Sequence, residues 1–185
     1  MSIKKIVFLL KLRMYKLLKK DDMEVRVSYY RSQGMEIGNR VRIFSDLAIA
    51  EPYLITIGDD VTISEGVRFL THDNSVIKLP CSEGTDLVGR ICIGNNCFIG
   101  CNTVFLPGVR IADNIIVGAG SIVTKSCLES HSIYAGNPAK KIGTWDSYLK
   151  KSKTYMFNFS PDGIRMNLTQ RKKIILENEE KLIRK

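Results

Sequence analysis

Histidine is scarce in this sequence, and cysteine never forms the motifs of a metal site. Only two histidines occur among 185 residues, His72 and His131. The five cysteines are an odd number, and no two of them form a C-x-x-C motif. Zinc sites and disulfide frameworks depend on such clusters. We therefore predict no metal site and no disulfide framework, and reduced thiols are typical of cytoplasmic proteins.

Long hydrophobic runs are also missing. The longest apolar run near the start is Ile6–Leu10, whereas a membrane-spanning helix needs about 20 apolar residues. No cleavage site of small residues follows it, which argues against a signal peptide. Serine nucleophile elbows, H-E-x-x-H motifs and phosphate-binding loops do not occur. At 44% hydrophobic and 25% charged residues, the sequence predicts one cytoplasmic domain with appendages.

The net charge of +9 is concentrated at the two ends of the chain. Residues 1–20 contain seven Lys or Arg and no acidic residue, and residues 140–185 contain twelve basic and five acidic residues. The middle, 21–139, contains nine basic and fourteen acidic residues. We expect no nucleic-acid partner, because such binders usually carry a basic patch with aromatic side chains that stack on bases.

The first 36 residues are predicted to form a basic helical segment ahead of the main domain. Apolar residues follow helical spacing there, with lysines between them: Ile3, Ile6, Val7, Leu10, Met14 and Leu17. A basic amphipathic helix can lie peripherally on the anionic inner face of a membrane, or it can pack on its own domain or on a neighbouring subunit. We favour packing on protein, because helices of this kind usually bury their apolar face in protein.

A column of bulky apolar residues recurs at every sixth position and dominates the middle of the sequence: Ile93, Ile99, Phe105, Ile111, Val117 and Val123. Neither a strand, with period two, nor a helix, with period 3.6, explains this spacing. It predicts a parallel β-helix built from hexapeptide repeats. A second inward column lies four places further on: Cys97, Thr103, Val109, Ile115, Ser121 and Cys127. Its two cysteines are therefore expected to be small buried hydrophobes.

The repeats define a predicted β-helix domain over residues 37–143, run to about Ala135 and are interrupted once. They begin with Ile37, Ile43, Ile49 and Ile55, slip by two residues, and continue with Ile57, Ile63 and Phe69. Residues 73–90 have no period and are predicted to form a long inserted loop, which in compact domains is usually functional. We predict a mainly β fold of about four to five coils, with a C-terminal helical extension over 144–185.

His72 lies where the repeats give way to this loop, in the sequence Thr71-His72-Asp73-Asn74. Loops held by a rigid scaffold often carry catalytic residues. An imidazole can remove a proton from a hydroxyl or amine near neutral pH. His72 is our candidate catalytic base, although a structural role for a loop histidine is the alternative. His131, near the end of the repeats, is expected to be a surface residue.

These motifs resemble the hexapeptide-repeat O-acetyltransferases over about residues 37–143. Within that family the chain is most similar to the galactoside, maltose and nodulation-factor acetyltransferases and to relatives that modify capsular and lipopolysaccharide sugars. Besides His72 and the inserted loop, the matching motifs are Ile93-Gly94-Asn95-Asn96, Pro107-Gly108-Val109, Gly118-Ala119-Gly120-Ser121-Ile122-Val123-Thr124-Lys125 and Ala135-Gly136-Asn137-Pro138-Ala139-Lys140.

The resemblance implies a left-handed β-helix that forms a homotrimer and binds acetyl-CoA in the groove between adjacent prisms. His72 would activate an acceptor hydroxyl for direct attack on the thioester, and a backbone N–H near Gly100-Cys101 would stabilise the oxyanion. The implied cofactor-binding residues are Cys101, Ala119, Thr124, Lys125, Lys140 and Lys141. The basic ones are lysines, which offer a point charge rather than a bidentate fork.

The resemblance says less about the identity of the acceptor and the residues that bind it. Galactoside-type members carry an Asn ahead of the insert, whereas this chain has Phe44-Ser45-Asp46. Our candidates for acceptor contacts are Asp46, Tyr53, Asp73 and Asn74. The basic ends fit a surface-polysaccharide precursor at the membrane face. Two alternatives stay open: N-acylation of a nucleotide-linked amino sugar, and a non-catalytic trimeric β-helix scaffold.

Overall fold

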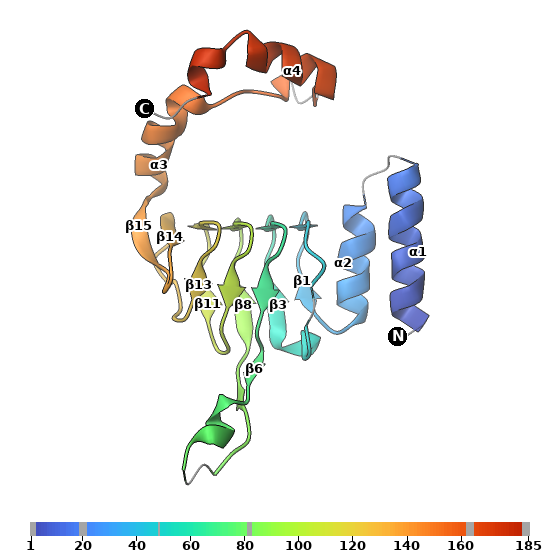
Figure 1. Ribbon diagram of the computed structural model, residues 1–185, viewed down its shortest axis with the longest axis vertical. Helices are drawn as coiled ribbons and strands as arrows, with labels where there is room; N and C mark the ends of the chain where they lie inside the picture. Colours follow the sequence, from blue (N-terminus) through green and yellow to red (C-terminus); the bar gives the residue numbers. More distant parts are fainter. Residues whose placement is uncertain (1–2, 19–21, 48, 81–82, 162–164, 183–185) are drawn as a thin grey trace. The chain divides into compact units, whose positions relative to one another are not determined.

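The computed structural model describes residues 3–18, 22–47, 49–80, 83–161 and 165–182. It separates into two compact units, Met1–Gly143 and Thr144–Lys185. The first unit is a coil whose successive turns contribute strands to three sheets (Figure 1). The pairs that join β1 through β14 in these sheets are all parallel.

Each sheet collects short strands from different parts of the sequence. The four-stranded sheet contains β1 (Glu36–Ile37), β3 (Ile55–Ile57), β8 (Ile91–Ile93) and β11 (Arg110–Ile111). The six-stranded sheet contains β15 (Lys140–Thr144), β14 (Ser132–Ala135), β12 (Ile115–Val117), β9 (Phe98–Ile99), β4 (Thr62–Ile63) and β2 (Arg42–Ile43). The three-stranded sheet contains β13 (Ile122–Val123), β10 (Val104–Phe105) and β5 (Arg68–Phe69).

The interior of the coil is filled by the six-residue columns. Phe69, Phe105 and Val123 stand in register on three successive coils, and all three are at most 2% exposed. The rings of Phe69 and Phe105 stack with centroids 5.2 Å apart. Cys97 and Cys127 of the second column are also buried. The parallel β-helix and the inward direction of both columns are therefore confirmed.

The corner between the four- and six-stranded sheets is formed by residues in the left-handed region. Asp60, Asn96 and Asn114 have φ values of 57°, 51° and 59° on successive coils. Asx residues tolerate this conformation, because their short polar side chains can hydrogen-bond locally. Here the Asn96 side-chain amide donates to Asn114 Oδ1 at 2.8 Å, and the Asp60 carboxylate accepts from Arg40 of the preceding coil. We call this stack of corner residues the corner ladder; its hydrogen bonds hold successive coils in register.

Two helices cover the first coil. Helix α2 (Met23–Ser32) packs on β1 and β2, and its Val27 and Tyr30 are buried in the coil core. Helix α1 (Ile3–Leu17) packs on α2, where Phe8 stacks on Tyr29 with ring centroids 3.9 Å apart. The open edge of a parallel sheet needs such a cover, and Figure 1 shows α2 lying between the coil and α1.

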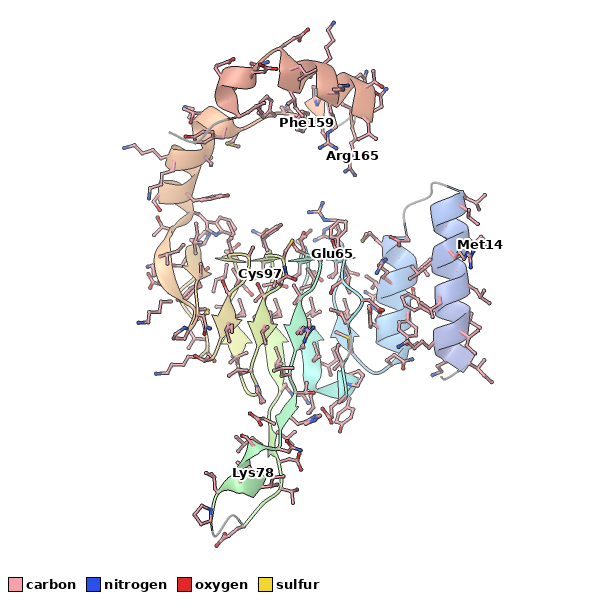
Figure 2. The ribbon with its side chains drawn as sticks, in the orientation of Figure 1. Met14, Glu65, Lys78, Cys97, Phe159 and Arg165 are labelled. Carbon is pink, nitrogen blue, oxygen red and sulfur yellow. The ribbon has the colours of Figure 1, made fainter. Side chains whose placement is uncertain are left out.

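The inserted loop leaves the coil as a short hairpin. Strands β6 (His72–Asp73) and β7 (Leu87–Val88) pair antiparallel, and a 3-10 turn, η2 (Ser75–Lys78), lies beyond them. Another 3-10 turn, η1 (Pro52–Leu54), falls at the predicted slip in the repeats. Figure 2 shows Lys78 on the hairpin, well outside the coil. We refer to residues 72–88 as the excursion.

The second unit consists of short helices. They are α3 (Trp145–Ser152), η3 (Lys153–Tyr155), α4 (Leu168–Leu176) and η5 (Glu179–Lys181). Sequence spacing predicts one helix over 167–185, of which 183–185 lie outside the described residues, whereas α4 ends at Leu176, where the Asn178 side-chain amide donates to the Ile174 carbonyl at 2.9 Å. In the described part of the chain, no helix combines the length and apolarity needed to cross a membrane.

Candidate active site

His72 is held at a corner of the coil by a carboxylate from the coil below. Its Nδ1 lies 2.9 Å from Glu51 Oε2, and the same oxygen accepts a hydrogen bond from the Thr71 hydroxyl. Thr71 is buried, whereas the side chains of His72 and Glu51 are 42% and 24% exposed. With Nδ1–H donated to Glu51, the Nε2 lone pair of a neutral ring is available for proton transfer.

Local structure explains how the three groups meet. Strand β5 ends at Phe69, and the Leu70 N–H still donates to the Phe105 carbonyl at 2.9 Å, which keeps the chain in the coil up to the corner. Glu51 directly precedes Pro52, whose turn carries the chain round the same corner one coil earlier. The Thr71 carbonyl accepts from the Gly89 N–H at 2.9 Å, so both ends of the excursion are tied together.

The electrostatics of this group favour a charged pair. The hydrogen bond that His72 donates to Glu51, and then the negative charge of Glu51, raise the pKa of His72 above its ordinary value. The hydrogen bonds from His72 and Thr71 lower the pKa of Glu51. Glu51 therefore stays ionised near neutral pH and stabilises the imidazolium that forms when His72 takes a proton.

Glu51 was not among the residues predicted from the sequence. It lies 20 residues before Thr71 and 21 before His72, because the two-residue slip lengthens that coil from the 18-residue spacing of later rungs to 20. A search for an acidic residue one coil before Thr71, with the slip included, leads to Glu51.

The four predicted acceptor residues lie in different places. Asp73 and Asn74 follow His72 on the excursion; Asp73 Oδ1 accepts from the Ser75 N–H at 2.8 Å, which lowers its pKa. Tyr53 is 61% exposed on η1, two residues after Glu51. Asp46 lies at the preceding corner, where its Oδ1 accepts from the Tyr30 hydroxyl at 3.2 Å. The structure thus brings three of the four to the His72 corner or its excursion.

Thr124 and Lys125 share a corner with His72. Strand register pairs Phe69 with Phe105 and Phe105 with Val123, so Lys125 lies over Thr71, two coils further along. At about 4.8 Å per coil, their backbones are roughly 10 Å apart. Both Thr124 and Lys125 are exposed.

Cys101 and Ala119 lie at the other edge of the three-stranded sheet. The Gly120 N–H donates to the Cys101 carbonyl at 2.7 Å, so the two coils stack closely there. A side chain on Gly100 would come within 2.4 Å of the Ala119 nitrogen, which explains the glycine. The Gly100 N–H is bonded to the Val117 carbonyl, so of the two amides suggested for the oxyanion only that of Cys101 stays a candidate.

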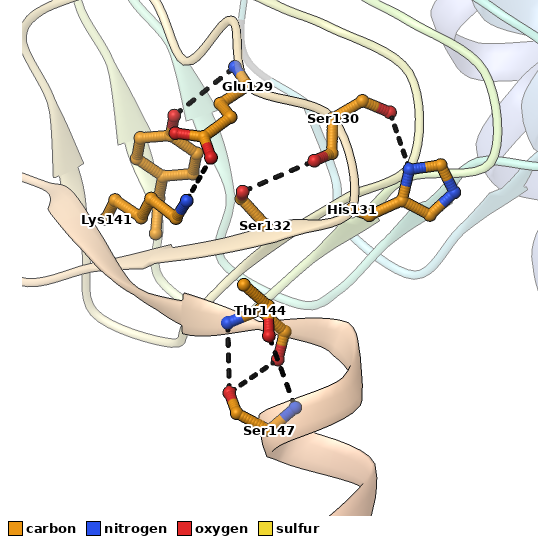
Figure 3. Close-up of polar contacts among 8 residues, drawn as sticks. Glu129, Ser130, His131, Ser132, Lys141, Thr144 and Ser147 are labelled. Carbon is orange, nitrogen blue, oxygen red and sulfur yellow. Dashed lines mark hydrogen bonds and ion pairs between the residues drawn. The ribbon is translucent and has the colours of Figure 1, made fainter.

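Lys140 and Lys141 begin β15 at the end of the coil. The Ala139 N–H donates to the Ile122 carbonyl at 2.8 Å, which places Lys140 just beyond strand β13. The Lys141 amine forms an ion pair with the Glu129 carboxylate (Figure 3). The two lysines therefore differ: the charge of Lys141 is partly neutralised within the protein.

Other reactive groups have structural surroundings. His131 has a φ of 55° at the last rung of the corner ladder and lies beside the Ser130 hydroxyl (Figure 3). Burial raises the pKa of Cys97 and of Cys127 to about 11. The four cysteines in the described ranges are free thiols, and Cys81 lies outside them. Among the described residues, no three His, Cys, Asp or Glu side chains are grouped to hold a metal.

Known proteins share both the repeats and the fold. Residues 93–125 match the family model for bacterial transferase hexapeptide repeats. Protein CapG of Staphylococcus aureus is 44% identical over 140 residues, covering 74% of this chain and 79% of CapG. Galactoside O-acetyltransferase of Escherichia coli K12 is 35% identical over 120 residues; the match covers 65% of this chain and 59% of that enzyme, less than two thirds of its length.

A solved structure of a galactoside acetyltransferase in complex with coenzyme A is also similar. It superposes with a TM-score of 0.52 at 27% sequence identity. The superposition covers 84% of this chain and 86% of the other.

Proposed function

The chain belongs to the hexapeptide-repeat acetyltransferases, and from this premise we propose that it transfers an acetyl group to a sugar hydroxyl with His72 as the general base. It is an acyltransferase, and acetyl-CoA is its acetyl donor. The observation that carries the proposal is the Glu51–Thr71–His72 group at the point where the excursion leaves the coil. A scaffold without chemistry gives no reason to orient an exposed imidazole in this way.

In the proposed reaction His72 Nε2 removes the proton from the acceptor hydroxyl as its oxygen attacks the thioester carbonyl carbon. The new C–O bond forms first, and the negative charge on the carbonyl oxygen is met by a backbone N–H, for which Cys101 is the candidate. The C–S bond then breaks, and the imidazolium returns its proton to the departing sulfur. The products are an O-acetyl ester and coenzyme A, and no acyl-enzyme forms.

A complete site requires two copies of the chain. The Cys101–Ala119 edge lies where the strands of the three-stranded sheet begin, and the His72 corner lies where they end. One strand with its flanking residues, about six residues in all, separates the two corners by roughly 15–20 Å. Two copies packed side by side would bring the His72 corner of one close to the Cys101 edge of the next. Exposed apolar residues on the excursion, Ile77, Leu79, Leu87 and Val88, suit such a contact. We propose a left-handed, four- to five-coil prism that forms a homotrimer with three sites.

We propose that the donor lies along the outside of the coil between these copies. Cys101 and Ala119 would line the pantetheine arm, Thr124 and Lys125 the far end of it, and Lys140 the phosphates, with Lys141 beside them. Their common exposure and their positions on successive coils support this assignment. The Glu129–Lys141 ion pair makes Lys140 the stronger phosphate contact.

For the acceptor we propose a surface-polysaccharide precursor, modified in the cytoplasm. Asp73, Asn74 and Tyr53 lie on or near the His72 corner, and Asp46 would reach the acceptor only from the opposite corner. An amino sugar bound to a nucleotide is the second candidate, because the same base could activate an amine.

The test is incubation with acetyl-CoA and a panel of hydroxyl and amino sugars, including polysaccharide precursors. Released thiol and the mass of the product are measured. We expect His72→Ala to lower kcat by about 10²–10⁴, the usual contribution of a general base, with donor affinity unchanged. The control is His131→Asn, which suits a left-handed backbone and is expected to keep full activity. Equal turnover by His72→Ala would remove His72 from the mechanism, and N-acetylated products would favour the second candidate.

A further inference from the structure

Helix α1 carries two apolar faces, and α2 covers only one of them. Phe8 is 3% exposed and packs against Tyr29 of α2. Leu12 and Tyr15, which follow at helical spacing, are half-buried on the same side. This face accounts for the attachment of α1 to the rest of the first unit.

The opposite face is an exposed stripe of apolar side chains. Its members follow the i, i+3, i+7 pattern of one helix face and are 80, 40, 63, 47 and 77% exposed, respectively: Ile3, Ile6, Leu10, Met14 and Leu17. At 100° per residue this stripe lies on the far side of the helix from Phe8. Figure 2 shows Met14 on the side of α1 that faces away from α2. We call these five residues the α1 stripe.

Basic residues border the α1 stripe on both sides. Lys11 lies on one side and Arg13 on the other, and both are exposed. Helix α1 contains no acidic residue. A mainly apolar groove of about 480 Å³ between α1 and α2 adjoins the stripe, since Ile3 of the stripe is among the residues that line it.

We propose that α1 docks this protein on an anionic lipid surface, with the α1 stripe among the acyl chains and Lys11 and Arg13 at the phosphates of the headgroups. An apolar face bordered by basic residues is the arrangement that binds in the plane of such an interface. A second copy of the stripe fits less well, because pairing two α1 helices would bring basic residues together without acidic partners on either helix. This surface is separate from the acetyl-transfer site and does not depend on it.

The experiment is flotation of the full chain with vesicles of phosphatidylcholine alone or mixed with phosphatidylglycerol. We expect the wild-type protein to float only with the anionic vesicles, and less of it to float as salt is added. The double variant Leu10→Glu/Leu17→Glu is expected to lose roughly tenfold or more in vesicle affinity. Leu168→Glu is the matched control, since Leu168 is 80% exposed but lies outside α1, and it is expected to float like the wild type.

Two results would overturn this proposal. One is failure of the wild-type chain to bind anionic vesicles at low salt. The other is a fall in the molar mass of the double variant in solution, measured by light scattering, which would identify the α1 stripe as a contact between copies. Acetylation of a water-soluble acceptor by the double variant reports separately on the active site, so loss of docking and loss of catalysis can be distinguished.

Discussion

The hydrogen bond between His72 and Glu51 gives the two nitrogens of the imidazole different roles. Nδ1 is fixed by a carboxylate that also accepts from Thr71, while Nε2 is left for the acceptor. The same carboxylate raises the pKa of His72, which makes it a stronger base but leaves more of it protonated at a given pH. If His72 is the base, as proposed, Glu51 is its positioning residue, and loss of Glu51 is expected to change both the rate and its pH dependence.

The pH profile of Glu51→Gln tests this role. The proposed base His72 can accept a proton only when neutral, so activity is expected to fall as the pH drops below its raised pKa. Glutamine keeps a hydrogen-bond acceptor but removes the negative charge, so the pKa of His72 falls. We expect the acidic limb of kcat/KM to shift to lower pH, together with a lower plateau. An unchanged limb with normal activity would show that Glu51 does not act through His72.

Lys140 and Lys141 offer a matched pair for the donor site. Removing Lys140 is expected to weaken acetyl-CoA binding, more at low than at high salt, because screening already reduces the contribution of an exposed charge. Lys141→Ala is expected to have a smaller effect, since its charge is paired with Glu129. Isothermal calorimetry at two salt concentrations measures both. Equal, salt-independent losses would point to packing instead of phosphate contacts.

At the level of the strand, stability depends on the inward column. Phe105 is fully buried and stacks on Phe69, so Phe105→Ala is expected to cost about 3–5 kcal/mol in unfolding free energy. Phe98 is 46% exposed on a neighbouring strand, and Phe98→Ala is expected to cost far less. Urea unfolding at fixed protein concentration compares them. Similar losses for both would contradict the inward assignment of the column.

Much of the coil could be predicted from the sequence because its spacing is local. The same six-residue step recurs from Ile93 to Val123, and the structure buries each of its members. Glu51 could not be predicted so directly, because its partnership with His72 crosses coils and depends on the slip near Pro52. The apolar face predicted for the first helix is not the one that packs on α2: Leu10 and Leu17 are exposed, and Phe8 makes the contact, since spacing alone does not say which apolar face a neighbouring helix covers.

At the level of the whole molecule, activity is proposed to arise between copies. If so, two inactive chains should complement each other: His72→Ala lacks the base, and Ala119→Trp blocks the opposite edge. Random mixing in a closed oligomer leaves about a quarter of the sites intact. We expect the co-expressed variants to recover activity toward that fraction.

Each variant alone is the control and is expected to stay inactive. Complementation would fail if one chain held a complete site, because every site in the mixture would then carry one of the two changes. Size-exclusion chromatography of the mixture verifies that hybrid oligomers have formed before activity is measured.

The stacked corner that holds Thr71, Pro107 and Lys125 also sets the distance between the proposed base and the residues proposed to bind the donor. Each coil adds about 4.8 Å along the prism, and later rungs repeat after 18 residues. Duplication of a rung between Thr71 and Lys125 would move the base one step away from the residues assigned to the donor. With the donor placed as proposed, the number of rungs in that interval is expected to match the length of acetyl-CoA.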